Sequence, residues 1–279
     1  MTFSIAARDG DAWGVAVASR FLAVGSLVPA VRVGVGAVAT QAMARVAYLC
    51  EVLDALAAGS TTADAVATAV AGDVDRDHRQ LGVVGPDGPV TYTGSQCLDW
   101  AGGRAGGDDR SAYAVQGNIL TGPEVVDAME RAWHEHTGQR LDERLVAVLL
   151  AGDAAGGDSR GRQSAALLVR QAGAGYDASG VLADLRVDDH PDAPSELARL
   201  LSLSMLHFGT PQDVQPLEGA LREEVAGRLV ALGHDDPDTA AALADWMGRV
   251  NLENRHADGG IDGRVLAVLR GTDPTLTQH

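Results

Sequence analysis

Alternating polar and apolar positions begin at the start of the chain and predict a strand over residues 2–8. Phe3, Ile5 and Ala7 fall on one face of this strand, and the other face carries Thr2, Ser4, Ala6 and Arg8. The turn sequence Asp9-Gly10-Asp11 then predicts a hairpin into a return strand over 13–19. A third strand is expected over 31–39, where Val, Ala and Gly predominate, as in strands covered on both faces.

Helices and strands follow one another along the rest of the chain. Apolar residues at three- and four-residue steps predict a pair of helices within 48–74, divided near Gly59. A capping box of Thr121 and Glu124 predicts the start of a helix that runs toward Trp133. Further strands are expected at 80–84, 90–93, 112–116, 163–169 and 182–187, and further helices at 141–150 and after Pro194. This order favours an α+β fold with largely antiparallel sheets.

A change in composition near residue 209 predicts a domain boundary. Gly209-Thr210-Pro211 and Pro216 interrupt the pattern, and helices are expected at 217–232 and 239–250. We therefore expect a main domain over 1–208 and a small, mostly helical module over 209–279.

The charge of the chain excludes several classes of function. The 279 residues include 22 Arg, no Lys and 38 acidic residues, so the formal net charge is -16. Such a surface repels phosphates, and we expect no nucleic-acid partner. A phosphate-binding P-loop and Schiff-base catalysis both need a lysine, so both are excluded.

Cys50 and Cys97 are too few for a disulfide framework, and we expect both to be small buried core residues. The first residues show no basic segment followed by an apolar one, and no run reaches the roughly 20 apolar residues of a membrane span. We expect a cytoplasmic protein with no membrane partner.

Thr2 is the first candidate for chemistry. Removal of Met1, which is common before a small residue, leaves an α-amine and a hydroxyl on one threonine. The amine has an ordinary pKa of about 7.7 to 8.0, so it can act as the local base for its own hydroxyl. The alternative is a strand residue without a catalytic role.

Several sequence blocks resemble one family over about residues 1–208. The blocks are MTFSIAARD, WGVAVASRFLAVGSLVP, VGVGAVATQA, HRQLGVV, QGNILTGPEVV, GGDSRGRQSAALLV and DLRVDDHP. In this order they resemble domain of unknown function 1028, a family assigned to the Ntn-hydrolase superfamily. The resemblance implies a four-layer αββα sandwich with an N-terminal nucleophile, which only Thr2 can supply here, at the mouth of a cleft. It makes Ser4 a neighbour on the same strand face.

Other residues are candidates for substrate binding. Asn118, in an expected turn at 116–118, can donate to an oxyanion or simply form the turn. Arg160 and Arg162 lie in a glycine-rich loop, where they can bind a substrate carboxylate or remain solvated. The remaining candidates are Ser4, beside Thr2 on its strand face, and residues at strand ends, namely Arg20, Gln41, Gln163 and Ser164.

The C-terminal segment resembles a small peptidoglycan-binding-like module through Trp246, Asn251-Leu252-Glu253, Arg255 and the stretch from Ile261 to Leu269. The module can bind a ligand, cover an edge of the main domain or contact a second copy in a homo-oligomer. Asp184, Asp188, Asp189 and His190 can form either a metal site or a turn before the helix at Pro194; we favour the turn and expect no metal and no cofactor.

The sequence thus predicts an Ntn-type amidohydrolase that cleaves the C–N bond of a small amide or peptide. Two alternatives remain: a non-catalytic ligand-binding protein on the same scaffold, with peptidoglycan fragments as candidate ligands, and a metal-dependent hydrolase.

Overall fold

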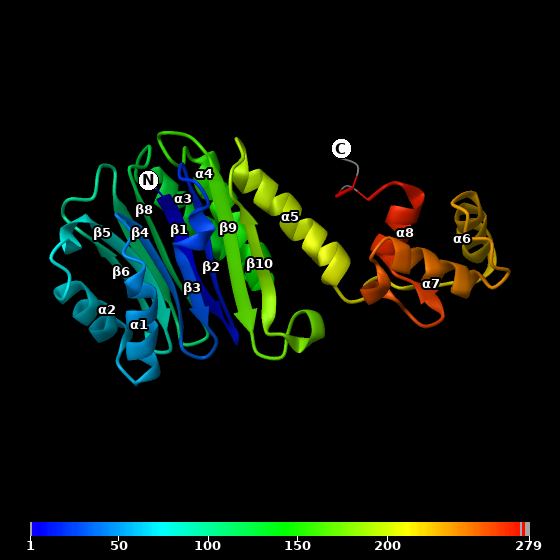
Figure 1. Cartoon of the computed structure of the whole chain (residues 1–279), viewed down its shortest axis with the longest axis horizontal. Helices are drawn as coiled ribbons and strands as arrows, with labels where there is room; N and C mark the ends of the chain where they lie inside the picture. Colours follow the sequence, from blue (N-terminus) through cyan, green and yellow to red (C-terminus); the bar gives the residue numbers. More distant parts are fainter. Residues whose placement is uncertain (1, 274, 277–279) are drawn as a thin grey trace. The chain divides into compact units, whose positions relative to one another are not determined.

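Two antiparallel sheets form the centre of the N-terminal part in the computed structural model, which describes residues 2–273 and 275–276 (Figure 1). The six-stranded sheet has the order β10 (Val181–Val187), β9 (Ser164–Gln171), β2 (Ala12–Ser19), β1 (Thr2–Asp9), β8 (Ser111–Asn118), β7 (Gly102–Gly107). The four-stranded sheet has the order β3 (Pro29–Arg32), β4 (Gly36–Ala42), β5 (Arg79–Gly85), β6 (Gly88–Thr93). β1 therefore lies inside the larger sheet.

Helices cover the outer face of each sheet. α1 (Ala47–Ala57) and α2 (Thr62–Ala71) pack on the four-stranded sheet, and α3 (Glu124–Glu135) and α4 (Leu141–Ala154) pack on the six-stranded sheet. The inner faces pack on each other, with β1 and β8 against β4 and β5. The fold is the four-layer αββα sandwich of the α+β class that the family resemblance implied.

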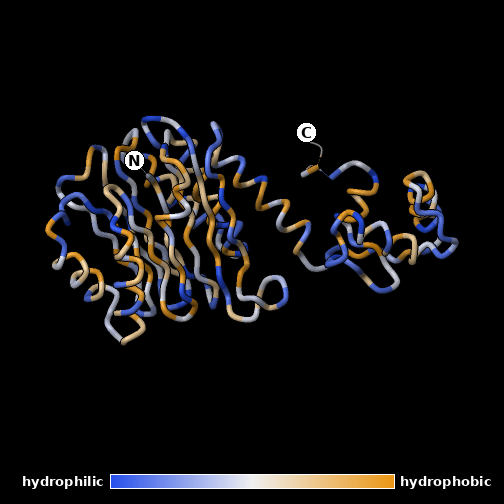
Figure 2. The backbone as a smooth tube through the Cα atoms, in the orientation of Figure 1, coloured by the Kyte–Doolittle hydropathy of each residue, from blue (hydrophilic) through white to orange (hydrophobic). Residues whose placement is uncertain are grey.

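Within a single strand, alternate side chains pack into two different cores of the sandwich. In β4, Ala37 and Ala39 join the core between the sheets, whereas Val38 joins the core under α1 and α2. Small alanines on the inner face let the two sheets approach closely. Hydrophobic residues are concentrated along these strands, and many connecting loops are hydrophilic (Figure 2).

The predicted strand over 31–39 is in fact a hairpin. Gly34 has a φ of +73° and lies in the turn between β3 and β4, a conformation that favours glycine. Strand β7 was not predicted because its sequence, Gly-Gly-Arg-Ala-Gly-Gly, has no apolar alternation. α4 extends past its predicted end at 150 and includes Gly152, where a side chain would collide with Met129 and Phe3.

Three smaller predictions were wrong. The capping box does not form: α3 begins at Glu124 after Pro123, without a side-chain cap. Cys50 is exposed on α1 and Cys97 is half-buried, so neither is a fully buried core residue. A cysteine's face on its element depends on packing that composition does not reveal.

The chain divides into two compact units between Ala198 and Arg199, within α5 (Ala193–Phe208) and before the composition change at 209. The C-terminal unit contains α6 (Gly219–Ala231), α7 (Thr239–Arg249), α8 (Gly263–Arg270) and a short pairing of β11 (Gln215–Pro216) with β12 (Gly260–Ile261). Its apolar core includes Leu206, Leu229, Trp246 and Leu266.

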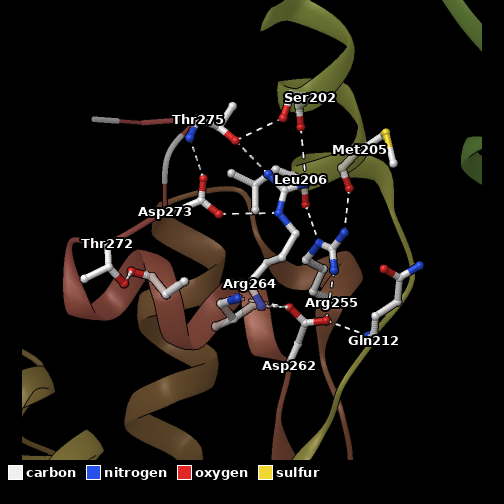
Figure 3. Close-up of polar contacts among 12 residues, drawn as sticks. Ser202, Met205, Leu206, Gln212, Arg255, Asp262, Arg264, Thr272, Asp273 and Thr275 are labelled. Carbon is white, nitrogen blue, oxygen red and sulfur yellow. Dashed lines mark hydrogen bonds and ion pairs between the residues drawn. The ribbon is translucent and has the colours of Figure 1, made fainter. Parts of the chain in front are cut away.

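A buried polar cluster ties this unit together (Figure 3). Arg255 donates to the carbonyl oxygens of Met205 and Leu206 and pairs with Asp262. Asp262 also caps α8 by accepting the backbone N–H groups of Arg264 and Val265.

Across the described residues, no helix combines the length and apolar character that crossing a membrane requires.

Candidate active site

Thr2 begins β1 and lies in a row of polar residues across three adjacent strands. Its register partners are Ser19 on β2 and Asn118 on β8. Thr2 Oγ1 lies 3.1 Å from Ser19 Oγ, and Asn118 Nδ2 is 3.5 Å from the Thr2 carbonyl oxygen. All three residues are buried in the chain that still carries Met1, and Thr2 is 6% exposed.

A network of side-chain amides lies behind Thr2, between the two sheets. Gln41 on β4 donates from Nε2 to the Thr2 carbonyl oxygen at 3.2 Å and to Gln80 Oε1 at 2.8 Å. Asn118 donates to the same Gln80 oxygen at 3.0 Å. The network thus fixes the backbone of Thr2 through contacts from both sheets.

Ser4 extends the network along β1. Its hydroxyl donates to Gln41 Oε1 at 2.6 Å and accepts from Gln116 Nε2 at 2.6 Å. Gln116 fits here because Gly82, on the facing strand, has no side chain: a Cβ there would lie 1.9 Å from Gln116 Oε1. That oxygen is buried and has no hydrogen-bond partner in the described structure.

Gln80 and Gln116 were not among the predicted site residues. Each is fully buried in a strand that is otherwise mostly buried and apolar. A buried glutamine needs hydrogen-bond partners, so a glutamine within an apolar strand was the sequence feature that could have indicated a polar network here. The predicted turn at 116–118 was wrong, because these residues are the last part of β8 and Asn118 ends that strand.

The side chains that hydrogen-bond to Thr2 in the described part of the chain are Ser19, Gln41 and Asn118. None of these three residues is an acid, a histidine or a lysine, so this shell of hydrogen-bonding side chains supplies no general base near neutral pH. It does supply amide donors in fixed positions, which suit charge that develops on a substrate oxygen.

A cavity of about 150 Å³ lies beside this row of residues. Ser19 and Ser164 line it together with Phe3, Asp153, Asp158 and Arg162, among others. The cavity therefore reaches Ser19, whose hydroxyl contacts Thr2. Its mixed lining of carboxylates, hydroxyls, a guanidinium and a phenyl ring fits a small polar group.

Acidic partners hold the arginines of the glycine-rich loop. Arg162 Nε lies 2.7 Å from Asp153 Oδ1, and this hydrogen bond raises the pKa of the Arg162 guanidinium. Arg160 pairs with Asp158 at 3.3 Å and is not part of the cavity lining. Asp158 also accepts the backbone N–H of Arg20, whose own side chain is exposed.

Gln163 and Ser164 differ in their surroundings. Gln163 directs its exposed amide to Asp189, at 3.1 Å, outside the cavity lining. Ser164 lines the cavity, but its hydroxyl accepts from the Val24 N–H and donates to the Phe21 carbonyl oxygen. It therefore anchors the segment that follows β2.

The acidic cluster near residue 190 is divided between strand β10, which contains Asp184, and the connection to α5, which contains Asp188, Asp189 and His190. Asp184 pairs with Arg186, Asp189 accepts from Gln163, and His190 Nδ1 accepts the Asp192 N–H. Among the described residues, no three His, Cys, Asp or Glu side chains are grouped so that they could hold a metal ion.

Comparison with family models places residues 2–197 in the "Family of unknown function (DUF1028)". The chain belongs to this family. A second model, described as "Putative peptidoglycan binding domain", matches residues 207–269. The DUF1028 match includes every predicted site residue, and the second match lies within the C-terminal unit.

A crystal structure of a DUF1028 protein from Silicibacter pomeroyi is similar to this chain. The two share 29% sequence identity with a TM-score of 0.64, and the match covers 80% of this chain and 92% of the other. No curated protein matches the chain.

Proposed function

We propose that this DUF1028 protein is an N-terminal-nucleophile amidohydrolase in which Thr2, once Met1 is removed, attacks the carbonyl carbon of a small amide or peptide. The supporting observation is the set of side chains that hydrogen-bond to Thr2: among the described residues these are two amides and a hydroxyl, none of them a general base, and the hydroxyl lines a cavity. A nucleophile in such a shell needs its own base, and a terminal α-amine provides one.

The proposed reaction begins at the terminal amine of Thr2. The Thr2 amine takes the hydroxyl proton, Oγ1 bonds to the amide carbon, and the carbonyl oxygen becomes an oxyanion. Collapse of this intermediate breaks the C–N bond, and the ammonium returns its proton to the leaving amine. Water then attacks the ester on Thr2, the amine again accepting a proton, and releases the carboxylic acid.

Gln41 and Asn118 are positioning residues in this proposal. Both donate to the Thr2 carbonyl oxygen, so they fix the backbone that carries the amine and the hydroxyl. Asn118, the register partner of Thr2 on the neighbouring strand, is also the proposed donor to the oxyanion.

Mass spectrometry of the intact protein tests the first requirement, since retained Met1 leaves no free Thr2 amine. Amine release from a panel of small amides and cell-wall dipeptides then tests the reaction. Thr2→Ala is expected to lower turnover about a thousandfold or more, whereas Thr2→Ser keeps the hydroxyl and retains activity. A chain with one Glu inserted between Met1 and Thr2 keeps the hydroxyl but blocks the amine, and is expected to be inactive.

Full hydrolysis by Thr2→Ala, or by the chain with the insertion, contradicts this assignment. A second candidate function, binding of peptidoglycan fragments without turnover, is favoured by the match over residues 207–269. Saturable muropeptide binding without amine release, unchanged in Thr2→Ala, supports this second candidate.

A further inference from the structure

Exposed apolar side chains are concentrated at one end of the sandwich. Among the described residues of the N-terminal unit, the large exposed hydrophobic side chains are Phe21, Leu22, Met43, Val46, Val74, Leu98 and Tyr176. All except Tyr176 lie in loops that follow β2, β4 and β6 or precede β5. The strand register places these loops at the Thr2 end of the sheets, and Tyr176, beyond the end of β9, at the opposite end.

Short connections link the loops on both sheets to Thr2. Phe21 lies two residues after Ser19, whose hydroxyl contacts Thr2 Oγ1. Met43 lies two residues after Gln41, whose amide binds the Thr2 carbonyl oxygen. The Leu98 carbonyl oxygen accepts the N–H of Ile119, the residue after Asn118. We call Phe21, Leu22, Met43 and Leu98 the apolar rim; each is at least 50% exposed.

The cavity that reaches Ser19, the hydrogen-bond neighbour of Thr2, differs in character from the rim. At about 150 Å³ it accommodates a group of roughly benzene size, and Asp153, Asp158 and Arg162 are among the residues that line it. A substrate larger than this group must extend over the neighbouring loops, which present the apolar rim. Isolated exposed hydrophobic residues are ordinary, but their concentration at one end of a domain marks a contact surface.

We infer that the substrate is an N-acyl amide with an aliphatic acyl chain that lies on the apolar rim, while its small polar amine part occupies the cavity. This inference rests on the proposed function, since it names the substrate class for the same nucleophile. A chain on the rim removes apolar surface from water on both partners, which a hydrophilic peptide in the same place would not do.

A series of β-lactones with alkyl substituents of one to nine carbons tests the inference without a known substrate. Thr2 Oγ1 attacks the lactone carbonyl, the ring C–O bond breaks, and the ring oxygen leaves as an alcohol that receives the hydroxyl proton. The protein gains the mass of the lactone, which intact mass spectrometry follows over time. Rates are divided by the reaction rate of each lactone with a free thiol.

The labelling rate of Thr2 is expected to rise about twofold per methylene, the increment for a chain that leaves half of its surface in water. The variant Phe21→Ser/Leu22→Ser is expected to lose at least fivefold with the nine-carbon lactone and to match the parent protein with the one-carbon lactone. Tyr176→Ser is the matched control, because it removes an exposed ring at the opposite end. It should leave both rates unchanged.

The outcomes separate the two proposals. Labelling that depends on Thr2 but not on chain length overturns the apolar-chain inference and leaves the nucleophile in place. The apolar-chain inference is likewise overturned if the rim variant and the Tyr176 control label at the same rates. No labelling by any lactone, in protein shown by mass to begin at Thr2, contradicts the proposed function itself.

Discussion

Arg255 and Asp262 form an ion pair inside the C-terminal unit, with 2.9 Å between Nη1 and Oδ2 (Figure 3). Both side chains are almost completely buried, at 2% and 0% exposure. Arg255 also binds carbonyl oxygens at the end of α5, and Asp262 caps α8, so this pair joins segments that are distant in sequence. A buried charge that loses its partner is costly, which makes the pair a point where the unit can be tested.

Arg255→Met should destabilise the C-terminal unit by about 3–5 kcal/mol, because it leaves the Asp262 carboxylate buried without its partner. Hydrogen exchange of the amides in 219–270, measured in increasing urea, reports this loss. Adding Asp262→Asn should recover part of the stability by removing the unpaired charge. Arg249→Gln, which removes only an exposed ion pair with Asp245, is the control and should change nothing measurable. An Arg255→Met protein as stable as the parent would contradict this account.

Gln80→Leu should destabilise the sandwich by about 2–4 kcal/mol, because the Gln80 oxygen accepts from both Gln41 and Asn118. The urea midpoint of unfolding measures the change. Thr93→Val removes one acceptor of the Gln80 amide and should cost about 1 kcal/mol or less. Equal effects of the two substitutions would show that the amide network does not act as a unit.

Gly82→Ala should reduce the acylation of Thr2 by a β-lactone at least severalfold, because the added methyl group occupies the place of the Gln116 amide and breaks its bond to Ser4. Overpacking should also cost about 1–3 kcal/mol of stability. Gly14→Ala is matched in chemistry, but its methyl group meets Leu145 and Val169 on the outer face of the sheet. It should lower stability without changing the labelling rate; similar rates for both variants would exclude a role for Gln116 at the site.

Asp73→Asn should lower stability by about 2 kcal/mol at neutral pH. The hydrogen bond from Arg79, against the opposing effect of burial, holds the pKa of Asp73 far below its ordinary value of 3.8. The charged form therefore contributes stability above pH 3.8, and this contribution is lost as the pH falls below 3.8 toward the folded pKa. Urea unfolding from pH 7 to 2.5 should show a constant difference between the proteins above about pH 5 that narrows below 3.8. A difference that widens in acid would contradict this sign.

Sequence patterns predicted much of the sandwich and part of its site. Period-two alternation located β1 and assigned Thr2 and Ser4 to one face, and the turn sequence Asp9-Gly10-Asp11 predicted its hairpin with β2, as the register confirms. The same pattern missed the turn at Gly34 and strand β7, because Val-Gly and Gly-Gly runs carry no contrast between faces. For Arg160 and Arg162 the sequence showed a loop but not the aspartates that pair with them.

The sequence by itself determined which residues share a face of each strand and that a threonine follows Met1, since both depend on chain order alone. Tertiary structure decided which faces meet. Gln41, Gln80 and Gln116 lie far apart in sequence and share one network only because β4 and β5 pack on β1 and β8. The apolar rim has the same origin: loops from two sheets lie at the Thr2 end of the sandwich, and alternation within a strand holds no information about the opposite sheet.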